Sequence, residues 1–171
     1  MTHDPTAPAR QRSPCGTGDG RRHRGKRRSG LARSTGVGRV SWATGPTLTP
    51  SLAQQTSGSV AYSGTWTGES NTSFSGGSSR YAKAASASAT YTFTGRSIGL
   101  VSVAALNRGK AKIYVDGTLV TTVDMADPTL TYRYLAYTKT WSSSGTHKIK
   151  VVVVGTSGRP RIDVDAFAVL K

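Results

Sequence analysis

Apolar and polar residues alternate in short runs from about Ser59 to the end of the chain. In residues 88–95, SATYTFTG, alanine, tyrosine and phenylalanine alternate with threonine, as a strand with one buried face requires. Residues 98–106, IGLVSVAAL, would be largely apolar on both faces of a strand and so predict a central strand. Because no segment shows a convincing helical period, the pattern predicts an all-β domain.

Residues 110–124, KAKIYVDGTLVTTVD, give the clearest hairpin signal in the chain. Two alternating runs flank an Asp-Gly pair, which is the residue pair that a tight two-residue turn favours. The register set by such a turn places Ile113 opposite Val120 and Tyr114 opposite Leu119.

The remaining strands are spaced as in a two-layer β domain. They are expected over residues 60–62, 131–138, 147–154 and 161–170. Residues 63–88 are mostly small and polar, show no regular alternation, and are expected to form mostly loop. Short strands at this spacing predict one antiparallel β-sandwich of jelly-roll type over residues 59–171.

The first part of the chain has a different composition. Residues 1–39 consist largely of Arg, Gly, Ser, Pro and Thr without apolar periodicity, which predicts a disordered basic tail. We hypothesise that this tail is not native to the domain that follows. Residues 40–58 contain two prolines that favour an extended path, and we interpret them as a linker.

Positive charge is concentrated in the tail. The chain has 23 Lys and Arg against 8 Asp and Glu, a net charge of +15, and residues 1–50 account for +8 of it. The run RRHRGKRR at 21–28 would attract phosphates, but the tail has no Phe, Trp or Tyr to stack on bases. We therefore expect nucleic acid to bind only weakly through the tail. No signal peptide or membrane-spanning segment is expected in this sequence.

Five motifs in a fixed order resemble the galactose-binding-like, carbohydrate-binding-module-like jelly-roll domains of secreted, multi-domain bacterial surface proteins. They are YSGTW at 62–66, TFTG at 92–95, RGKAKIYVDG at 108–117, GTHKIKVVV at 145–153 and VDAFAVL at 164–170. The segment SWATGPTLTP at 41–50 is similar to the end of a fibronectin or immunoglobulin-like repeat, so the linker resembles the remnant of an upstream repeat.

The resemblance implies a non-catalytic module that binds a carbohydrate or cell-wall polymer, an anionic one by preference because the domain is basic. It also implies an extracellular or cell-surface location and a monomer. One alternative is a passive structural or adhesion spacer without a small ligand, which predicts that Trp66 is buried. Another is nucleic-acid binding through the basic tail.

A sugar site needs an aromatic face and polar side chains that fix the hydroxyl groups. The candidate ligand-binding residues are Trp66, Glu69, Asn71, Arg80 and Tyr81 in the long loop, with Asn107 and Arg108 before the hairpin. Trp66 is equally suited to closing one end of the sandwich as a core residue. Tyr132 and Tyr134 are expected to pack in the core.

Catalytic signatures are missing from the sequence. It has no G-x-S-x-G, P-loop or H-E-x-x-H motif, and His147 is expected to bond a neighbouring turn. Asp163 and Asp165 are two residues apart and so lie on the same face of the predicted strand. At least one of them is expected to be structural. We therefore expect no enzyme, no catalytic residue and no cofactor. A structural calcium ion held by Asp163, Asp165 or Asp124 stays open.

Overall fold

Ten strands and one short 3-10 turn form the part of the chain that the structure, a computed structural model, describes: residues 48–171. The elements are β1 Pro50–Gln54, β2 Val60–Ser63, β3 Thr67–Ser70, η1 Ser75–Gly77, β4 Ser78–Ala82, β5 Ser88–Ala104, β6 Lys110–Val115, β7 Thr118–Asp124, β8 Thr131–Val153, β9 Ile162–Val164 and β10 Ala166–Leu170. The predicted disorder and nucleic-acid binding of the tail concern residues outside this range. Within it, no helix is long and apolar enough to cross a membrane.

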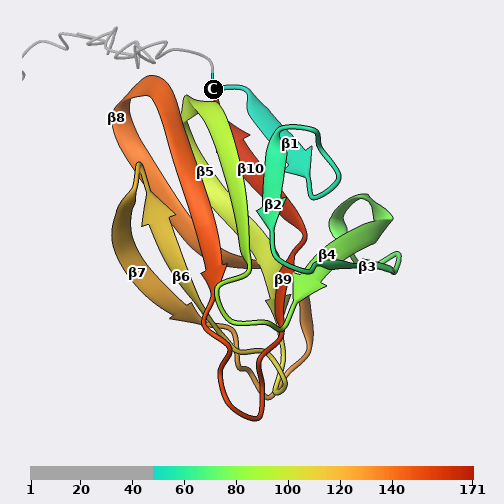
Figure 1. Cartoon of the computed structure of the whole chain (residues 1–171). Helices are drawn as coiled ribbons and strands as arrows, with labels where there is room; N and C mark the ends of the chain where they lie inside the picture. The colour runs from blue at the N-terminus through green and yellow to red at the C-terminus, as the bar shows by residue number, and fades with distance from the viewer. Residues whose placement is uncertain (1–47) are drawn as a thin grey trace, which may run out of the picture. The chain divides into compact units, whose positions relative to one another are not determined.

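Two long strands, β5 and β8, organise the sandwich. They pair antiparallel from Ser88 opposite Val152 to Ala104 opposite Thr131, and their register shifts beside Gly95. Both strands turn over at the same end of the molecule (Figure 1). In the first layer, the start of β5 pairs with β2 and the end of β8 pairs with β6, which in turn pairs with β7. In the second layer, the later part of β5 pairs with β10, which in turn pairs with β1. Strands that change layer at a bend are one way of closing a sandwich corner. The predicted antiparallel β-sandwich is confirmed.

The bend requires a residue without a side chain. A Cβ atom on Gly95 would lie 2.6 Å from the carbonyl oxygen of Leu170 and 2.6 Å from a methyl carbon of Val169. Such distances are shorter than van der Waals contact, so only glycine lets β5 pass this close to β10.

The core lies between the two layers. The alternation predicted for residues 88–95 is confirmed, because Tyr91 and Phe93 are buried while Thr92 and Thr94 are exposed. The Tyr91 ring stacks on Phe167 of β10, with ring centroids 5.1 Å apart. Since Phe167 belongs to the opposite layer, this stack joins the two layers.

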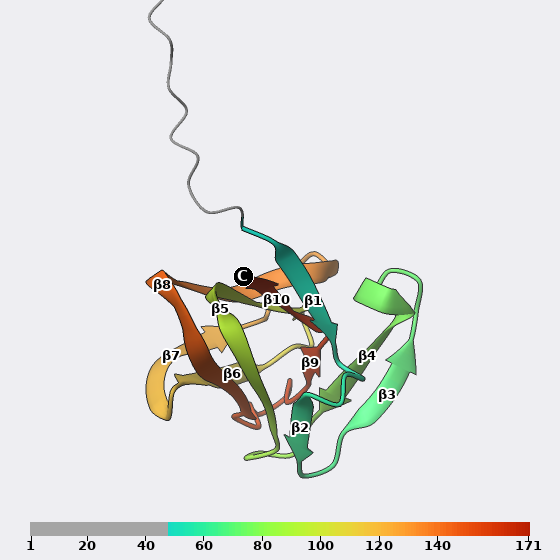
Figure 2. The ribbon, with the colours of Figure 1, turned by 90° about the horizontal axis from the view of Figure 1, so that it is seen from above.

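Residues 63–88, predicted to form mostly loop, contain two strands that the prediction missed. β3 and β4 lie within this range and form a small antiparallel sheet with β9. Seen from above, β3 and β4 project on the side of the sandwich away from β6 and β7 (Figure 2). The pairing partner of β4 is β9, far along the chain, so local alternation carried no signal for it. The strand predicted over 161–170 is divided into β9 and β10 at Asp165.

The predicted linker is shorter than expected at its C-terminal end. β1 pairs antiparallel with β10, from Pro50 opposite Leu170 to Gln54 opposite Ala166. The sandwich therefore begins at Pro50, not at Ser59. β1 is an edge strand, and proline is tolerated as the first residue of such a strand because its missing N–H leaves no ladder bond unmade.

The predicted hairpin turn is confirmed, but part of the predicted register between its two strands is wrong by one residue. Asp116 and Gly117 both have positive φ, 51° and 83°, as the tight turn requires. Tyr114 lies opposite Leu119 as predicted, but Ile113 lies opposite Thr121 because the register shifts between Ile113 and Tyr114. Bulges of this kind leave no clear mark in the sequence pattern.

We predict that Phe167→Ala lowers the free energy of unfolding by about 3 to 5 kcal/mol, because it removes a fully buried ring from between the layers. Urea denaturation followed by tryptophan fluorescence measures this loss. Thr92→Ala on the exposed face of β5 is the control, with an expected change within about 0.5 kcal/mol. Equal effects of the two substitutions would contradict the role of the stack.

Candidate functional site

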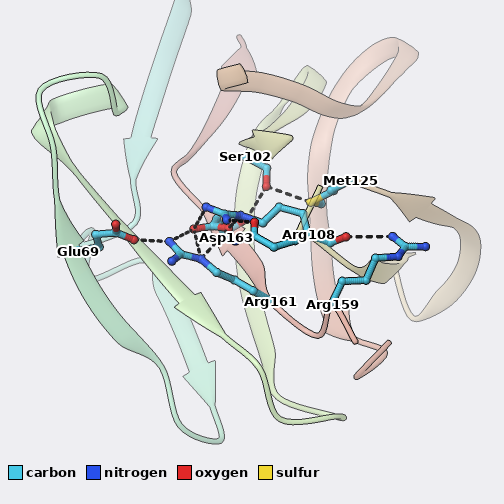
Figure 3. A network of polar contacts seen from close by, with 8 residues as sticks. Glu69, Ser102, Arg108, Met125, Arg159, Arg161 and Asp163 are labelled. Carbon is cyan, nitrogen blue, oxygen red and sulfur yellow. Dashed lines mark hydrogen bonds and ion pairs between the residues drawn. The ribbon is translucent and has the colours of Figure 1, made fainter. Parts of the chain in front are cut away.

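A fully buried carboxylate, Asp163 on β9, is the centre of the polar network in Figure 3. It accepts hydrogen bonds from Arg108 Nε at 2.6 Å and from Arg161 Nη2 at 2.5 Å and Nε at 3.0 Å. The two guanidinium groups are themselves largely shielded from water. A buried carboxylate is stable only with such partners, so the pairing fixes the loop before β6 and the residue before β9 in one place.

Arg161 extends the network to the small sheet. Its Nη2 also donates to the Glu69 carboxylate on β3, and its guanidinium carbon lies 3.9 Å from the centroid of the Tyr81 ring on β4. Burial opposes the charge, yet the hydrogen bonds that Arg161 donates to Asp163 and Glu69 keep the pKa of Arg161 above its ordinary value. Arg161 is therefore a permanent cation held between three side chains, those of Asp163, Glu69 and Tyr81.

Arg159 fixes a further loop at the same end of the sandwich. It donates to the backbone oxygen of Arg108 at 2.9 Å and to both carboxylate oxygens of Asp124, at 2.5 and 2.8 Å. The hydrogen bonds from Arg159 lower the pKa of Asp124 to about 2. The loops that follow β5 and β8 are thereby tied to each other and to the end of β7.

These loops enclose an open hollow of about 450 Å³, which we call the end hollow. Its lining includes Glu69, Leu106, Asn107, Arg108, Leu130, Tyr132 and Arg161. Leu106 and Leu130 are 71% and 53% exposed, which is unusual for leucine, while the arginines below them are held by Asp163. The end hollow thus combines apolar walls with a rigid polar floor.

Three of the seven predicted ligand-binding residues, Glu69, Asn107 and Arg108, line the end hollow together. Asn107 lies at its rim, and its Oδ1 accepts a 2.5 Å hydrogen bond from Arg108 Nη1. Two chain segments that are well separated in sequence therefore meet at one site, as the prediction supposed.

The other four predicted residues lie elsewhere. Trp66 is half-buried, donates from Nε1 to the carbonyl of Ser63 at 3.1 Å, and packs against Tyr62 at 5.1 Å. Arg80 lies 4.9 Å from the centre of the same Tyr62 ring. Burial raises the pKa of Tyr62 to about 12, which marks this cluster as part of the domain's packing. Trp66 is thus intermediate between the buried residue of the spacer alternative and an exposed platform.

Asn71 and Tyr81 have local structural contacts. The Oδ1 atom of Asn71 accepts a hydrogen bond from the backbone N–H of Ser73 at 2.9 Å, which closes a turn in the loop after β3. Tyr81 lies under the guanidinium of Arg161 and so supports the end hollow from behind.

Four of the lining residues named above, Leu106, Leu130, Tyr132 and Arg161, were not among the predicted site residues. Tyr132, predicted to be in the core, is half-buried, packs edge-on against Phe74 at 5.2 Å and lines the end hollow. Tyr134, also predicted in the core, is 36% exposed. Arg161 left one signal in the sequence, because it lies two positions before Asp163 and so points to the same side of a strand.

Asp163 and Asp165 do not form a shared acid-base pair. Both oxygens of Asp165 accept from the backbone N–H of Ser75, at 2.9 and 3.0 Å, and burial raises the pKa of this carboxyl. The three candidate calcium ligands are thus bonded to separate donors, and they do not fit a common calcium site. Among residues 48–171 no three His, Cys, Asp or Glu side chains are grouped for a metal. Calcium binding at any one of them stays a prediction.

The predicted hydrogen bond of His147 to a turn is confirmed. Its Nδ1 lies 2.8 Å from a carboxylate oxygen of Asp116 in the hairpin turn, and its ring stacks on Trp141 with centroids 3.9 Å apart. These contacts lie on the sandwich and not in the end hollow.

A second hollow of about 450 Å³ lies on the outer face of the layer that contains β1 and β10. Its walls include Leu52, Leu135 and Leu170, and its lining has neither an aromatic ring nor a charged side chain. Such a surface offers few groups that would orient sugar hydroxyls.

Comparisons with known proteins point to carbohydrate-active proteins. The chain is 33% identical over 110 residues to A type blood N-acetyl-alpha-D-galactosamine deacetylase of Flavonifractor plautii, and 37% identical over 109 residues to A type blood alpha-D-galactosamine galactosaminidase of the same organism. Each match covers 64% of this chain but only 14% and 10% of those proteins. No protein-family model matches the chain.

Among solved structures, a family two carbohydrate esterase from Cellvibrio japonicus resembles the domain with a TM-score of 0.54 at 10% identity. The match covers 72% of this chain and 34% of the esterase chain. At this identity the likeness shows a shared fold alone. The sandwich is therefore an architecture that also occurs as part of a larger carbohydrate-active protein.

We predict that Asp163→Asn destabilises the domain by about 3 to 5 kcal/mol, because it leaves two shielded arginines with a neutral partner. Asp165→Asn is the matched control two residues away. An asparagine oxygen can still accept from Ser75, so we expect little loss or a gain in stability at neutral pH. Thermal and urea unfolding of both variants measure the difference.

The pH dependence distinguishes the two carboxylates further. Because burial raises the pKa of Asp165 in the folded state, the charged form costs stability above that pKa, and the cost disappears below the pKa of an unfolded Asp. Any advantage of Asp165→Asn should therefore be present at neutral pH and vanish in acid. A loss in Asp165→Asn equal to that in Asp163→Asn would contradict this account.

Proposed function

We propose that the chain contains a non-catalytic carbohydrate-binding module of the galactose-binding-like jelly-roll class, and that the end hollow binds the glycan. The observation that carries the proposal is the composition of this hollow. Leu106, Leu130 and Tyr132 offer apolar surface to the C–H face of a sugar, while Glu69 and Asn107 offer hydrogen-bonding groups for hydroxyls.

Preorganisation supports the proposal. The polar floor of the end hollow is held by the bonds of Arg108 and Arg161 to buried Asp163, so these groups need little ordering when a ligand arrives. Binding then loses less conformational entropy than it would at mobile side chains. A site that is formed before the ligand arrives is typical of small-molecule recognition.

The chemistry of the end hollow favours binding over catalysis. Glycoside hydrolysis uses two carboxyl groups, one as an acid and one as a base or nucleophile. Here Asp163 is fully buried between two guanidinium groups, and Glu69 is ion-paired with Arg161. Neither carboxyl is placed to exchange a proton with a bound sugar.

The relatives support a glycan ligand and suggest its type. The two Flavonifractor plautii proteins are named for substrates that contain galactosamine or its N-acetyl form, and this chain matches about a tenth of their length. A domain of that size is consistent with a module that binds a glycan beside a separate catalytic domain. We accordingly propose galactose-type glycans as ligands and an extracellular or cell-surface location.

The test is a titration of the full chain with N-acetylgalactosamine, galactose and oligosaccharides that end in them, followed by calorimetry. We predict that Tyr132→Ala weakens binding about tenfold, as expected for loss of a ring that covers a sugar. Tyr134→Ala is the matched control, since Tyr134 is on the same strand but does not line the end hollow.

Two results would overturn the proposal. One is a folded protein that binds none of these sugars, which would favour the spacer alternative. The other is hydrolysis or deacetylation of a sugar by the purified chain, which would contradict a non-catalytic role. Equal losses in Tyr132→Ala and Tyr134→Ala would move the site away from the end hollow.

A further inference from the structure

The outer face of the first layer carries three lysines side by side. Lys148 and Lys150 alternate with inward residues on β8, and Tyr114 of β6 lies opposite Lys150 in the register. Lys112 lies opposite Val152, so it shares the same side of the sheet. We call the surface of Lys112, Tyr114, Lys148 and Lys150 the basic face. All three of its lysines are exposed.

These lysines have no carboxylate partner among the ion pairs of residues 48–171. Asp116 lies beside these lysines, since its backbone N–H donates to the carbonyl of Lys148, but its carboxylate is engaged elsewhere. One of its oxygens contacts the His147 ring at 2.8 Å, and the other accepts from the backbone N–H of Lys148 at 2.8 Å. The ammonium groups of the basic face are therefore available to an external anion.

A half-buried aromatic ring lies among the lysines. Tyr114, Lys148, Lys150 and Val152 line an open hollow of about 460 Å³. On the next strand, Thr90 lies opposite Lys150 and Thr92 opposite Lys148, so hydroxyl groups border the lysines. Cations, hydroxyls and a ring together suit a ligand that has both sugar rings and negative charges.

The arrangement of the charges favours a polymer. Residues two apart on a strand are separated by about 7 Å, so the lysines form a spread array and do not converge on one point. A single small anion would contact one or two of them. A chain with repeated anionic groups would contact all three across the face.

We propose that the basic face binds an acidic polysaccharide, one whose sugar units carry carboxylate or sulfate groups. The inference rests on the proposed function, because it assigns a second, charged ligand class to the same carbohydrate-binding domain. A single ring beside three lysines fits a polysaccharide better than a single-stranded nucleic acid, which is held by stacking of successive bases on several aromatic side chains.

The experiment measures binding of the full chain to polygalacturonate and to chondroitin sulfate, with dextran as the uncharged control, by biolayer interferometry at two salt concentrations. We expect the double substitution Lys148→Gln/Lys150→Gln to weaken binding to at least one acidic polymer about tenfold. Lys83→Gln/Lys171→Gln removes the same charge from exposed lysines outside the basic face, and we expect a change below about twofold.

The matched pair makes the proposal falsifiable. Every variant keeps residues 1–47, so any binding by the arginines there is common to both. Equal losses of affinity in the two double variants would show that binding follows net charge alone. That result would overturn the proposal that the basic face is the binding site. Tighter binding of a single-stranded oligonucleotide than of either polysaccharide, lost in Lys148→Gln/Lys150→Gln, would also overturn it.

The two proposals can fail separately. Tyr132→Ala should leave binding to the acidic polymers unchanged, and Lys148→Gln/Lys150→Gln should leave titrations with neutral sugars unchanged. Tyr114→Ala adds a readout that a charge effect does not give, because loss of a ring contact should weaken binding similarly at both salt concentrations. A Tyr114→Ala effect that disappears at high salt would contradict a role for the ring.

Discussion

The pairing of Asp163 with Arg108 and Arg161 is the interaction on which the functional end of the molecule depends. A carboxylate without access to water would otherwise be among the most destabilising groups in the core. Its two partners come from the loop before β6 and from the residue before β9, and the second of them reaches on to Glu69 of the small sheet. One buried charge thus determines where three segments meet, and the end hollow exists because they meet there.

The two long strands supply the frame for this end. β5 and β8 pass through both layers and pair with each other along nearly their whole length. The same hydrogen-bond ladder therefore fixes the parts of both strands in each layer and the bend between them. The stack of Tyr91 on Phe167 closes the layers against each other, and Gly95 permits the close approach at the corner. Loops at the opposite end therefore start and finish on rigid strands, which is the usual setting for binding residues.

The sequence predicted the elements whose pattern is local and missed those whose pattern depends on a distant partner. Alternation in residues 88–95 and the Asp-Gly turn are properties of short stretches, and both are confirmed. β1 pairs with β10 and β4 pairs with β9, and no short stretch encodes that pairing; β3 joins the small sheet only through β4. The site followed the same rule. Glu69, Asn107 and Arg108 were chosen by chemistry, whereas Tyr132 and Arg161 join them only through the fold.

The pairing of β1 with β10 has a consequence for how the sandwich is attached to other polypeptide. Thr49 and Lys171 exchange backbone hydrogen bonds of 3.0 Å, so the two ends of the fold lie side by side (Figure 1). Any segment joined before one or after the other departs from that shared edge, while the loops around the end hollow lie at the far end. Because both ends of the fold lie at one pole, polypeptide attached at either end need not cross the end hollow at the other pole.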